Sequence, residues 1–182
     1  MVTATAPAQL ASFWTEEQAD VLHFSLVSNG FRGLGWLNRF GDSDFSLSNN
    51  ARAIISSPVF KPIPGVLYDI CLFRGGSLHF RHIRRITKNI GAYAKSHMCL
   101  NPPLELACIM RQEIADSHIR KMGLRAIVIM HRVKVAEKPC LLRIHSHKGA
   151  SWLDTAADNP DHEWPEDYGF AYLEGISSCW KR

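Results

Sequence analysis

An arginine and a serine, each at the end of a predicted strand, have the most distinctive chemistry in this sequence. An apolar run ends in Arg74-Gly75-Gly76, and a second short run leads to Ser96. A guanidinium can form two parallel hydrogen bonds with a phosphate or carboxylate, and glycines let a ligand approach the backbone closely. We expect the two strand ends to converge on one cleft. The alternative for Arg74 is a surface arginine at a tight turn.

Histidines near a predicted strand at 139–145 raise the possibility of a metal site. His145 and His147 would share one face of that strand, since alternate residues do, and Cys140 and His162 lie on either side in sequence. The set has no second ligand pair at the spacing typical of structural zinc sites. We therefore expect solvated histidines at a strand end, and no metal site.

Three further motifs are interpreted as structural. The glycines of residues 31–35 are not preceded by a strand and lack a third glycine, so they predict no phosphate-binding loop. The basic residues of 81–88 are not interleaved with aromatic residues and predict a solvated helix face, with no specific nucleic-acid partner. Cys99 follows His97, but a packed thiol is favoured over a nucleophile.

The composition is that of an ordinary globular protein. The 182 residues are enough for one domain with a core, and 46% are hydrophobic and 21% charged. No apolar run is long enough to span a membrane, so no membrane partner is expected. The formal charge of +4 suits an anionic ligand but also an unremarkable surface. Five cysteines, an odd number, indicate buried thiols in a reducing compartment.

The hydrophobic pattern predicts an α+β fold, with helices mainly first and strands dominating the second half. Helices are predicted over residues 13–27, 48–57, 79–90 and 102–116. Strands are predicted over residues 66–73, 93–98, 125–135, 139–145 and 168–176, with a polar loop over 147–165. The later strands follow one another too closely for crossover helices, which favours a mostly antiparallel sheet.

In combination, these segments resemble the mono-ADP-ribosyltransferase family, and in particular the type III effectors of plant-pathogenic bacteria with this fold. The matching features are the strand end Leu72–Gly76, the Ser96–Met98 segment, the Asn101-Pro102-Pro103 opening of a helix and the strand at 125–135. The resemblance implies a mono-ADP-ribosyltransferase-like fold, with N-terminal helices followed by a mostly antiparallel split β-sheet. We expect a linker or disordered tail over residues 1–12 and a single domain of this kind over 13–182.

The resemblance also implies a site for NAD, bound as a substrate. The residues implied to bind NAD are Arg74, Gly75, Ser96 and His97. In the family, a Glu-x-Glu strand supplies the carboxylate that stabilises the positively charged ribose formed as nicotinamide leaves. This sequence contains no Glu-x-Glu. The nearest substitute acids are Glu163, Glu166 and Asp167.

Three functions follow as hypotheses. The first is an effector domain with an altered active site, which binds a host protein or peptide in the former NAD cleft after delivery into the host cytoplasm. The second is an active mono-ADP-ribosyltransferase that uses a substitute acid. The third is a plain interaction module with an aromatic surface. The aromatic residues that would form this surface are Trp152, Trp164, Tyr168 and Tyr172.

Overall fold

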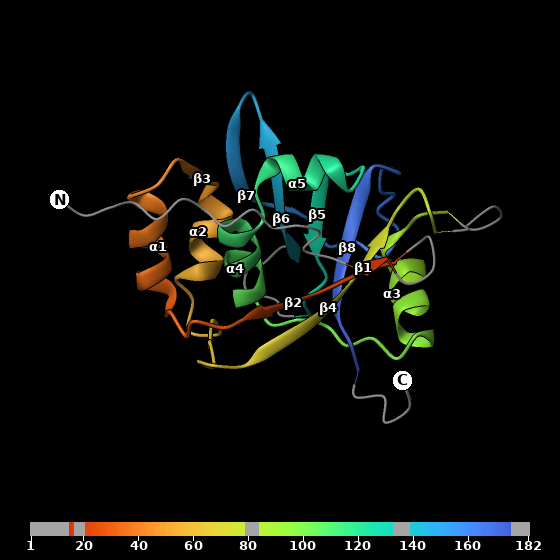
Figure 1. Cartoon of the computed structure of the whole chain (residues 1–182), viewed down its shortest axis with the longest axis horizontal. Helices are drawn as coiled ribbons and strands as arrows, with labels where there is room; N and C mark the ends of the chain where they lie inside the picture. Colours follow the sequence, from red (N-terminus) through yellow and green to blue (C-terminus); the bar gives the residue numbers. More distant parts are fainter. Residues whose placement is uncertain (1–14, 17–20, 79–83, 133–138, 176–182) are drawn as a thin grey trace.

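The computed structural model describes residues 15–16, 21–78, 84–132 and 139–175, and its strands form one sheet (Figure 1). The strand order is β1-β2-β4-β8-β5-β6-β7-β3. The strands are β1 (Thr15–Glu16), β2 (Val21–Val27), β3 (Phe45–Leu47), β4 (Leu67–Arg74), β5 (Ala126–Ile129), β6 (Cys140–His147), β7 (Ala150–Ala157) and β8 (Tyr168–Leu173). The helices are α1 (Gly33–Gly41), α2 (Asn49–Ile55), α3 (Thr87–Ser96), α4 (Glu105–Glu113) and α5 (Asp116–Lys121).

The sheet is mixed. Strands β5 and β8 pair in parallel, as do β3 and β7, whereas the other neighbouring pairs are antiparallel. β5, β6 and β7 are successive antiparallel neighbours, so β7 runs in the direction of β5. The chain then crosses back through residues 158–167 and enters β8 beside β5, in that same direction. The predicted α+β class is confirmed. The predicted mostly antiparallel split sheet is wrong, and the sheet is a single mixed one. Residues 158–167 connect two parallel strands without a helix, so close spacing of the strands in sequence did not exclude parallel pairing.

Alternate residues of β4 belong to two hydrophobic clusters. Ile70 and Leu72 lie in one cluster, and Cys71 and Phe73 lie in the other. Because successive side chains of a strand point to opposite faces, each cluster marks one face of the sheet. We call the face of Ile70 and Leu72 the first face, and that of Cys71 and Phe73 the second face.

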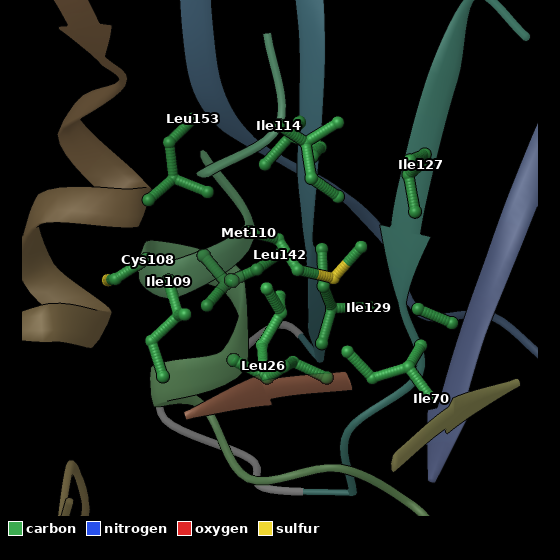
Figure 2. Close-up of a cluster of buried hydrophobic side chains, with 14 of the residues drawn as sticks. Leu26, Ile70, Cys108, Ile109, Met110, Ile114, Ile127, Ile129, Leu142 and Leu153 are labelled. Carbon is green, nitrogen blue, oxygen red and sulfur yellow. The ribbon is translucent and has the colours of Figure 1, made fainter. Parts of the chain in front are cut away.

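The helices divide between these two faces. α1, α2, α4 and α5 contribute side chains to the first-face cluster, whereas α3 contributes Ile90 and Ala94 to the second. Figure 2 shows Ile109 and Met110 of α4 packed among apolar side chains from the strands. Burial of this apolar surface is the main favourable contribution to the free energy of folding.

Helix α4 carries two charged residues into the first-face core. Glu105 is 2% exposed and Arg111 is 1% exposed. Arg111 donates to the carboxylate of Asp116 at 2.8 Å and to the carbonyl oxygen of Ile114 at 2.6 Å. Glu105 accepts hydrogen bonds from the hydroxyls of Tyr68 and Ser28. A buried charged group needs a countercharge or hydrogen-bond partners; Arg111 has the carboxylate of Asp116, and Glu105 has its hydroxyl donors.

Helix α1 forms where a glycine-containing loop could have been expected. A Cβ atom at Gly33 would lie 2.0 Å from the carbonyl oxygen of Ile55, at the end of α2. Glycine at this position therefore permits the close approach of the two helices. Trp36 and Phe40, one helical turn apart on α1, are buried against each other with ring centroids 5.4 Å apart.

Several predicted elements are confirmed. The helix at 48–57 is α2, which Ser48 caps by accepting a hydrogen bond from the backbone N–H of Ala51. The strands at 66–73 and 139–145 are β4 and β6, and β8 accounts for most of the strand at 168–176. Residue 176 lies outside the described residues.

Two predictions within the first hundred residues are wrong. The helix at 13–27 is wrong because residues 21–27 form β2, in which Leu22, Phe24 and Leu26 point inward at period two. The strand at 93–98 is wrong because these residues continue and end α3, whose buried Ile90 and Ala94 are spaced as one helical turn. Of the helix predicted at 79–90, residues 84–86 are not helical and 79–83 lie outside the described residues.

The remaining corrections concern the second half. The loop predicted at 147–165 contains β7, which pairs with β6 along all eight of its residues. The helix predicted at 102–116 is the shorter α4, which ends at Glu113, and a separate helix, α5, begins at Asp116. The strand at 125–135 is the shorter β5, and 133–135 lie outside the described residues.

The predicted boundary between a tail at 1–12 and a domain from 13 stays a prediction, since residues 1–14 also lie outside the described part. None of the described helices is long and apolar enough to cross a membrane.

Candidate functional site

Arg74 is the last residue of β4 and lies opposite Gly169 of β8. The next backbone N–H, that of Gly75, donates to the carbonyl oxygen of Tyr168 at 2.7 Å. A Cβ atom at Gly75 would lie 2.8 Å from the carbonyl oxygen of Glu166. The space beside this glycine is thus filled by the chain entering β8. The glycine is explained by that close approach without invoking a ligand.

Ser96 is the last residue of α3, and its hydroxyl serves the helix end. The hydroxyl donates to the carbonyl oxygen of Tyr93 at 2.7 Å. His97 Nδ1 lies 2.9 Å from the same carbonyl oxygen, and its ring lies 4.2 Å from that of Tyr93. Such local bonds satisfy carbonyl groups that a helix leaves without partners at its C-terminus. Ser96 and His97 therefore have a structural role in ending α3.

Arg74 and Ser96 start from opposite faces of the sheet. Arg74 has the same pleat position as Leu72, on the first face, and its partner Gly169 packs against Leu72 on that face. Ser96 belongs to α3, which covers the second face. The described geometry brings His97 to the ring of Phe73, 6.0 Å away, and does not join Ser96 to Arg74.

Two of the three candidate acids are paired with arginines. Glu163 accepts from Arg84 at 2.7 Å on an exposed surface, and this guanidinium lowers the pKa of the Glu163 carboxyl. Asp167 lies 3.2 Å from Arg125. Glu166 is exposed, and its backbone lies against the turn at Gly75. Each paired carboxylate already has a countercharge of its own.

Asp167 also lines a groove of about 450 Å³ on the first face, beside α5. The lining residues are Asp116, Ile119, Arg120, Gly123, Leu124, Arg125, Ser146 and Asp167. Asp116 is occupied by Arg111 and by the hydroxyl of Ser151, which donates to it at 2.6 Å. Because both signs of charge line the groove and Arg125 pairs with Asp167 within it, it has no strong preference for an anion.

A second groove, of about 380 Å³, lies between the start of α1 and the segment after α2. Leu34, Ile55, Phe60 and Pro62 supply its apolar wall, and Arg32 and Lys61 supply positive charge. No carboxylate of the described residues lines it. Its volume is within the range of ordinary ligand pockets.

Exposed apolar side chains gather around this second groove. Phe31, Leu34, Val59 and Ile63, which line this groove or directly adjoin its lining residues in sequence, form what we call the apolar patch, with exposed fractions between 39% and 70%. Two backbone hydrogen bonds, from Ser28 to Val66 at 2.8 Å and from Gly65 to Ser28 at 2.9 Å, hold its two stretches side by side. Outside the patch, the large apolar residues of comparable exposure in the described part are Met98, Leu100, and the pair Val27 and Leu67, which are partners across β2 and β4.

The aromatic surface considered in the sequence does not assemble. Trp164 is 2% exposed and its indole N–H donates to the hydroxyl of Thr87 at 2.9 Å. Tyr172 is 3% exposed and also belongs to the second-face cluster. With two of its four aromatics in the core, the interaction-module hypothesis loses this surface.

The histidines considered for a metal site also remain apart. His145 lies on β6, with its Nε2 3.7 Å from the carboxylate of Asp154, and burial lowers its pKa with help from Arg143. His162 packs against Trp164 at 4.3 Å. Among the described residues, the side chains close enough together to hold a metal ion are His23, Cys71 and Glu174, and neither histidine belongs to this group.

The sequence interpretation missed the apolar patch and the His23 group. The patch had a weak signal: apolar residues within the proline-rich stretch at 58–65 have no place in a helical or strand period. The members of the His23 group are widely separated in sequence, so no spacing motif could have revealed them.

Comparisons with protein-family models, with curated proteins and with solved structures give no match. The fold and the geometry of the grooves are therefore the observations on which a function is proposed.

Proposed function

We propose that this chain is a protein-binding domain without NAD turnover, and that the apolar patch and its groove bind an extended segment of a partner protein. The observation that carries the proposal is the gathering of exposed apolar side chains around one hollow. Scattered surface hydrophobics are normal, whereas contiguous apolar patches with a polar rim are typical of interaction sites.

The charge of the groove suggests the chemistry of the partner. Arg32 and Lys61 line it, and Arg39 lies 5.7 Å from the ring of Phe31. A segment with large apolar side chains flanked by Asp or Glu would match this pattern, because the apolar groups leave water while the carboxylates face cations at the rim.

The state of the candidate acids supports the absence of turnover. Glu163 and Asp167 have arginine partners, and Arg74 and Ser96 leave opposite faces of the sheet. A preorganised carboxylate is the main group that would offset positive charge on the departing ribose. The proposal therefore keeps the altered-site hypothesis from the sequence, and moves the binding surface away from the Arg74 turn. Delivery into a host cell, as the family resemblance implies, belongs to the same proposal.

Selection from a random peptide display library tests this function. We expect enriched peptides to combine two or more large apolar residues with Asp or Glu, and to lose enrichment on a Leu34→Ser variant. Leu100→Ser is the matched control, since Leu100 is 53% exposed outside the patch. Enrichment that survives Leu34→Ser, or a library that yields only basic peptides, would contradict the proposal.

A further inference from the structure

Three side chains capable of binding a metal meet on the second face of the sheet, and a fourth, Cys99, lies beside them. His23 comes from β2, Cys71 from β4 and Glu174 directly follows β8. The Nδ1 atom of His23, the Sγ atom of Cys71 and a carboxylate oxygen of Glu174 all lie within 4.8 Å of one another. The fourth side chain is Cys99, which packs against the second-face cluster that contains Cys71 and whose thiol donates to the carbonyl oxygen of His97 at 3.6 Å.

The backbone pairing explains why these four residues lie close together. His23 and Cys71 are direct partners across β2 and β4. The bridge between Leu100 and Leu173 places the preceding Cys99 opposite the following Glu174. Because paired strands hold these backbones, the group is built by the sheet and does not depend on a long surface loop.

The chemistry of the four donors points to zinc. One imidazole nitrogen, two sulfurs and one carboxylate oxygen are a complete tetrahedral set for Zn²⁺. Bond lengths of about 2.0–2.3 Å would place ligand atoms roughly 3.3–3.8 Å apart. The His23 and Cys71 atoms are now 4.0 Å apart and the His23 and Glu174 atoms 2.5 Å apart, so small side-chain shifts would create the site.

The surroundings of the group add a second observation. Cys71 is 5% exposed, whereas the side chain of Glu174 is 43% exposed. The group is therefore buried on the side of Cys71 and open to solvent on the side of Glu174. The hydroxyl of Tyr172, the direct partner of Cys71 across β4 and β8, is buried and has no hydrogen-bond partner within the described residues. A hydroxyl in this position can donate to a metal-bound thiolate, as outer-shell groups in metal sites do.

We propose that His23, Cys71, Cys99 and Glu174 form a zinc site that fastens the end of β8 and the segment after α3 to β2 and β4. The site is separate from the apolar patch, and its existence does not depend on the proposed protein-binding function. The ligand set that the sequence suggested, Cys140 with the histidines His145, His147 and His162, shares no residue with it.

Titration calorimetry of the reduced full chain with Zn²⁺, in parallel with Co²⁺ absorption spectroscopy, tests the site. We expect one ion per chain, and a Co²⁺ spectrum with sulfur-to-metal charge transfer and tetrahedral ligand-field bands. His23→Gln and Glu174→Gln should each weaken Zn²⁺ binding by at least about tenfold. Cys99→Ser should also remove part of the charge-transfer intensity.

The controls are chosen to separate loss of a ligand from loss of the fold. Cys140→Ser removes a half-buried thiol elsewhere, and Glu166→Gln removes an exposed carboxylate elsewhere, so both should bind Zn²⁺ like the wild type. His23 and Glu174 are partly exposed, so their variants should fold even if a Cys71 variant does not. The proposal is overturned if the reduced wild type binds no Zn²⁺, or if the His23 and Glu174 variants bind it as the controls do. A Cys71–Cys99 disulfide that forms in air, in a protein whose reduced form binds no Zn²⁺, would overturn it in favour of a redox pair.

Discussion

The backbone N–H of Ile63 donates to the buried carboxylate of Glu105 at 3.2 Å. This bond ties an exposed residue of the apolar patch to helix α4, which lies in the first-face core. The same carboxylate accepts from Ser28 at 2.8 Å and from Tyr68. The surface proposed to bind a partner is thus held in shape by a charge inside the protein.

Replacing Glu105 by Gln should therefore destabilise the whole domain. An amide cannot accept from three donors as a carboxylate does, and its NH₂ group would face other donors. Hydrogen bonds to charged groups are worth about 1.5–3 kcal/mol, so we expect a loss of that size in urea unfolding. Tyr68→Phe, which removes one donor and keeps the carboxylate, should cost less. Equal stability of Glu105→Gln and the wild type would show that the carboxylate is not a structural centre.

The pH dependence of stability should include a contribution from His145. Burial first, and then the charge of Arg143, lower the pKa of this histidine below its ordinary value of 6.5. As the pH falls below 6.5, the unfolded chain binds a proton at this residue while the folded chain does not. Stability must therefore fall with acid, by at most about 1.4 kcal/mol per pH unit for one group.

Denaturant unfolding between pH 7 and pH 5 measures this slope. His145→Gln should make the slope shallower. Burial raises the pKa of Asp154, but hydrogen bonds from Thr155, Ser48 and Arg143 lower it more. The stability that this carboxylate adds is therefore lost only below its ordinary pKa of 3.8, outside the pH range of this measurement. A steeper slope in His145→Gln would reverse the sign predicted here.

Gly33 should be needed for the contact between α1 and α2. Alanine at this position would place its Cβ 2.0 Å from a backbone carbonyl of Ile55, which cannot move aside as a flexible side chain would. Overpacking of this kind costs about 1–3 kcal/mol. Gly41→Ala is the control: nothing lies within 4 Å of a Cβ there, and helix propensity predicts a gain of about 0.5–1 kcal/mol. Thermal unfolding of both variants decides, and a Gly33→Ala variant as stable as Gly41→Ala would contradict the packing.

The elements predicted correctly from the sequence are those with a strong local pattern. β4 is a dense apolar run, and α2 starts at a capping serine. β2 was missed because Val21 and Val27 were assigned to a helical face, although Leu22, Phe24 and Leu26 alternate at period two. β7 has a weak hydrophobic pattern, because Leu153 is its one buried residue. Backbone hydrogen bonds to β6 stabilise the strand instead, and a local sequence pattern does not reveal them.

The candidate sites, both the expected Arg74–Ser96 site and the His23 group, were less predictable than the fold. Which residues meet in them depends on contacts between segments far apart in sequence. Ser96 was expected on a strand beside Arg74, but one glycine, Gly91, was not enough to end helix α3. A glycine within a helix costs only about 1 kcal/mol, less than the burial of Ile90 and Ala94 contributes. His23 and Cys71 became neighbours through the register of β2 on β4, which no local pattern encodes.

Incubation with NAD should release no nicotinamide above the buffer rate, and Arg74→Ala should not change this. The loss of one preorganised group costs on the order of 100- to 1000-fold in rate. Here two features of the expected site are missing: Glu163 and Asp167 are paired with arginines, and Arg74 and Ser96 lie on opposite faces of the sheet. Chromatographic detection of nicotinamide is the measurement. Turnover abolished by Arg74→Ala would instead establish the active transferase, and amides at Glu163, Glu166 and Asp167 would then identify its acid.

The most direct test of the proposed function is the affinity of one selected peptide for matched surface variants. Titration calorimetry should show that Leu34→Ser weakens binding of an apolar–acidic peptide by about tenfold or more, as loss of an interface residue worth over 1 kcal/mol does. Leu100→Ser, the same change outside the patch, should bind like the wild type. Equal affinities for Leu34→Ser and Leu100→Ser would contradict the assignment of the apolar patch as the binding surface.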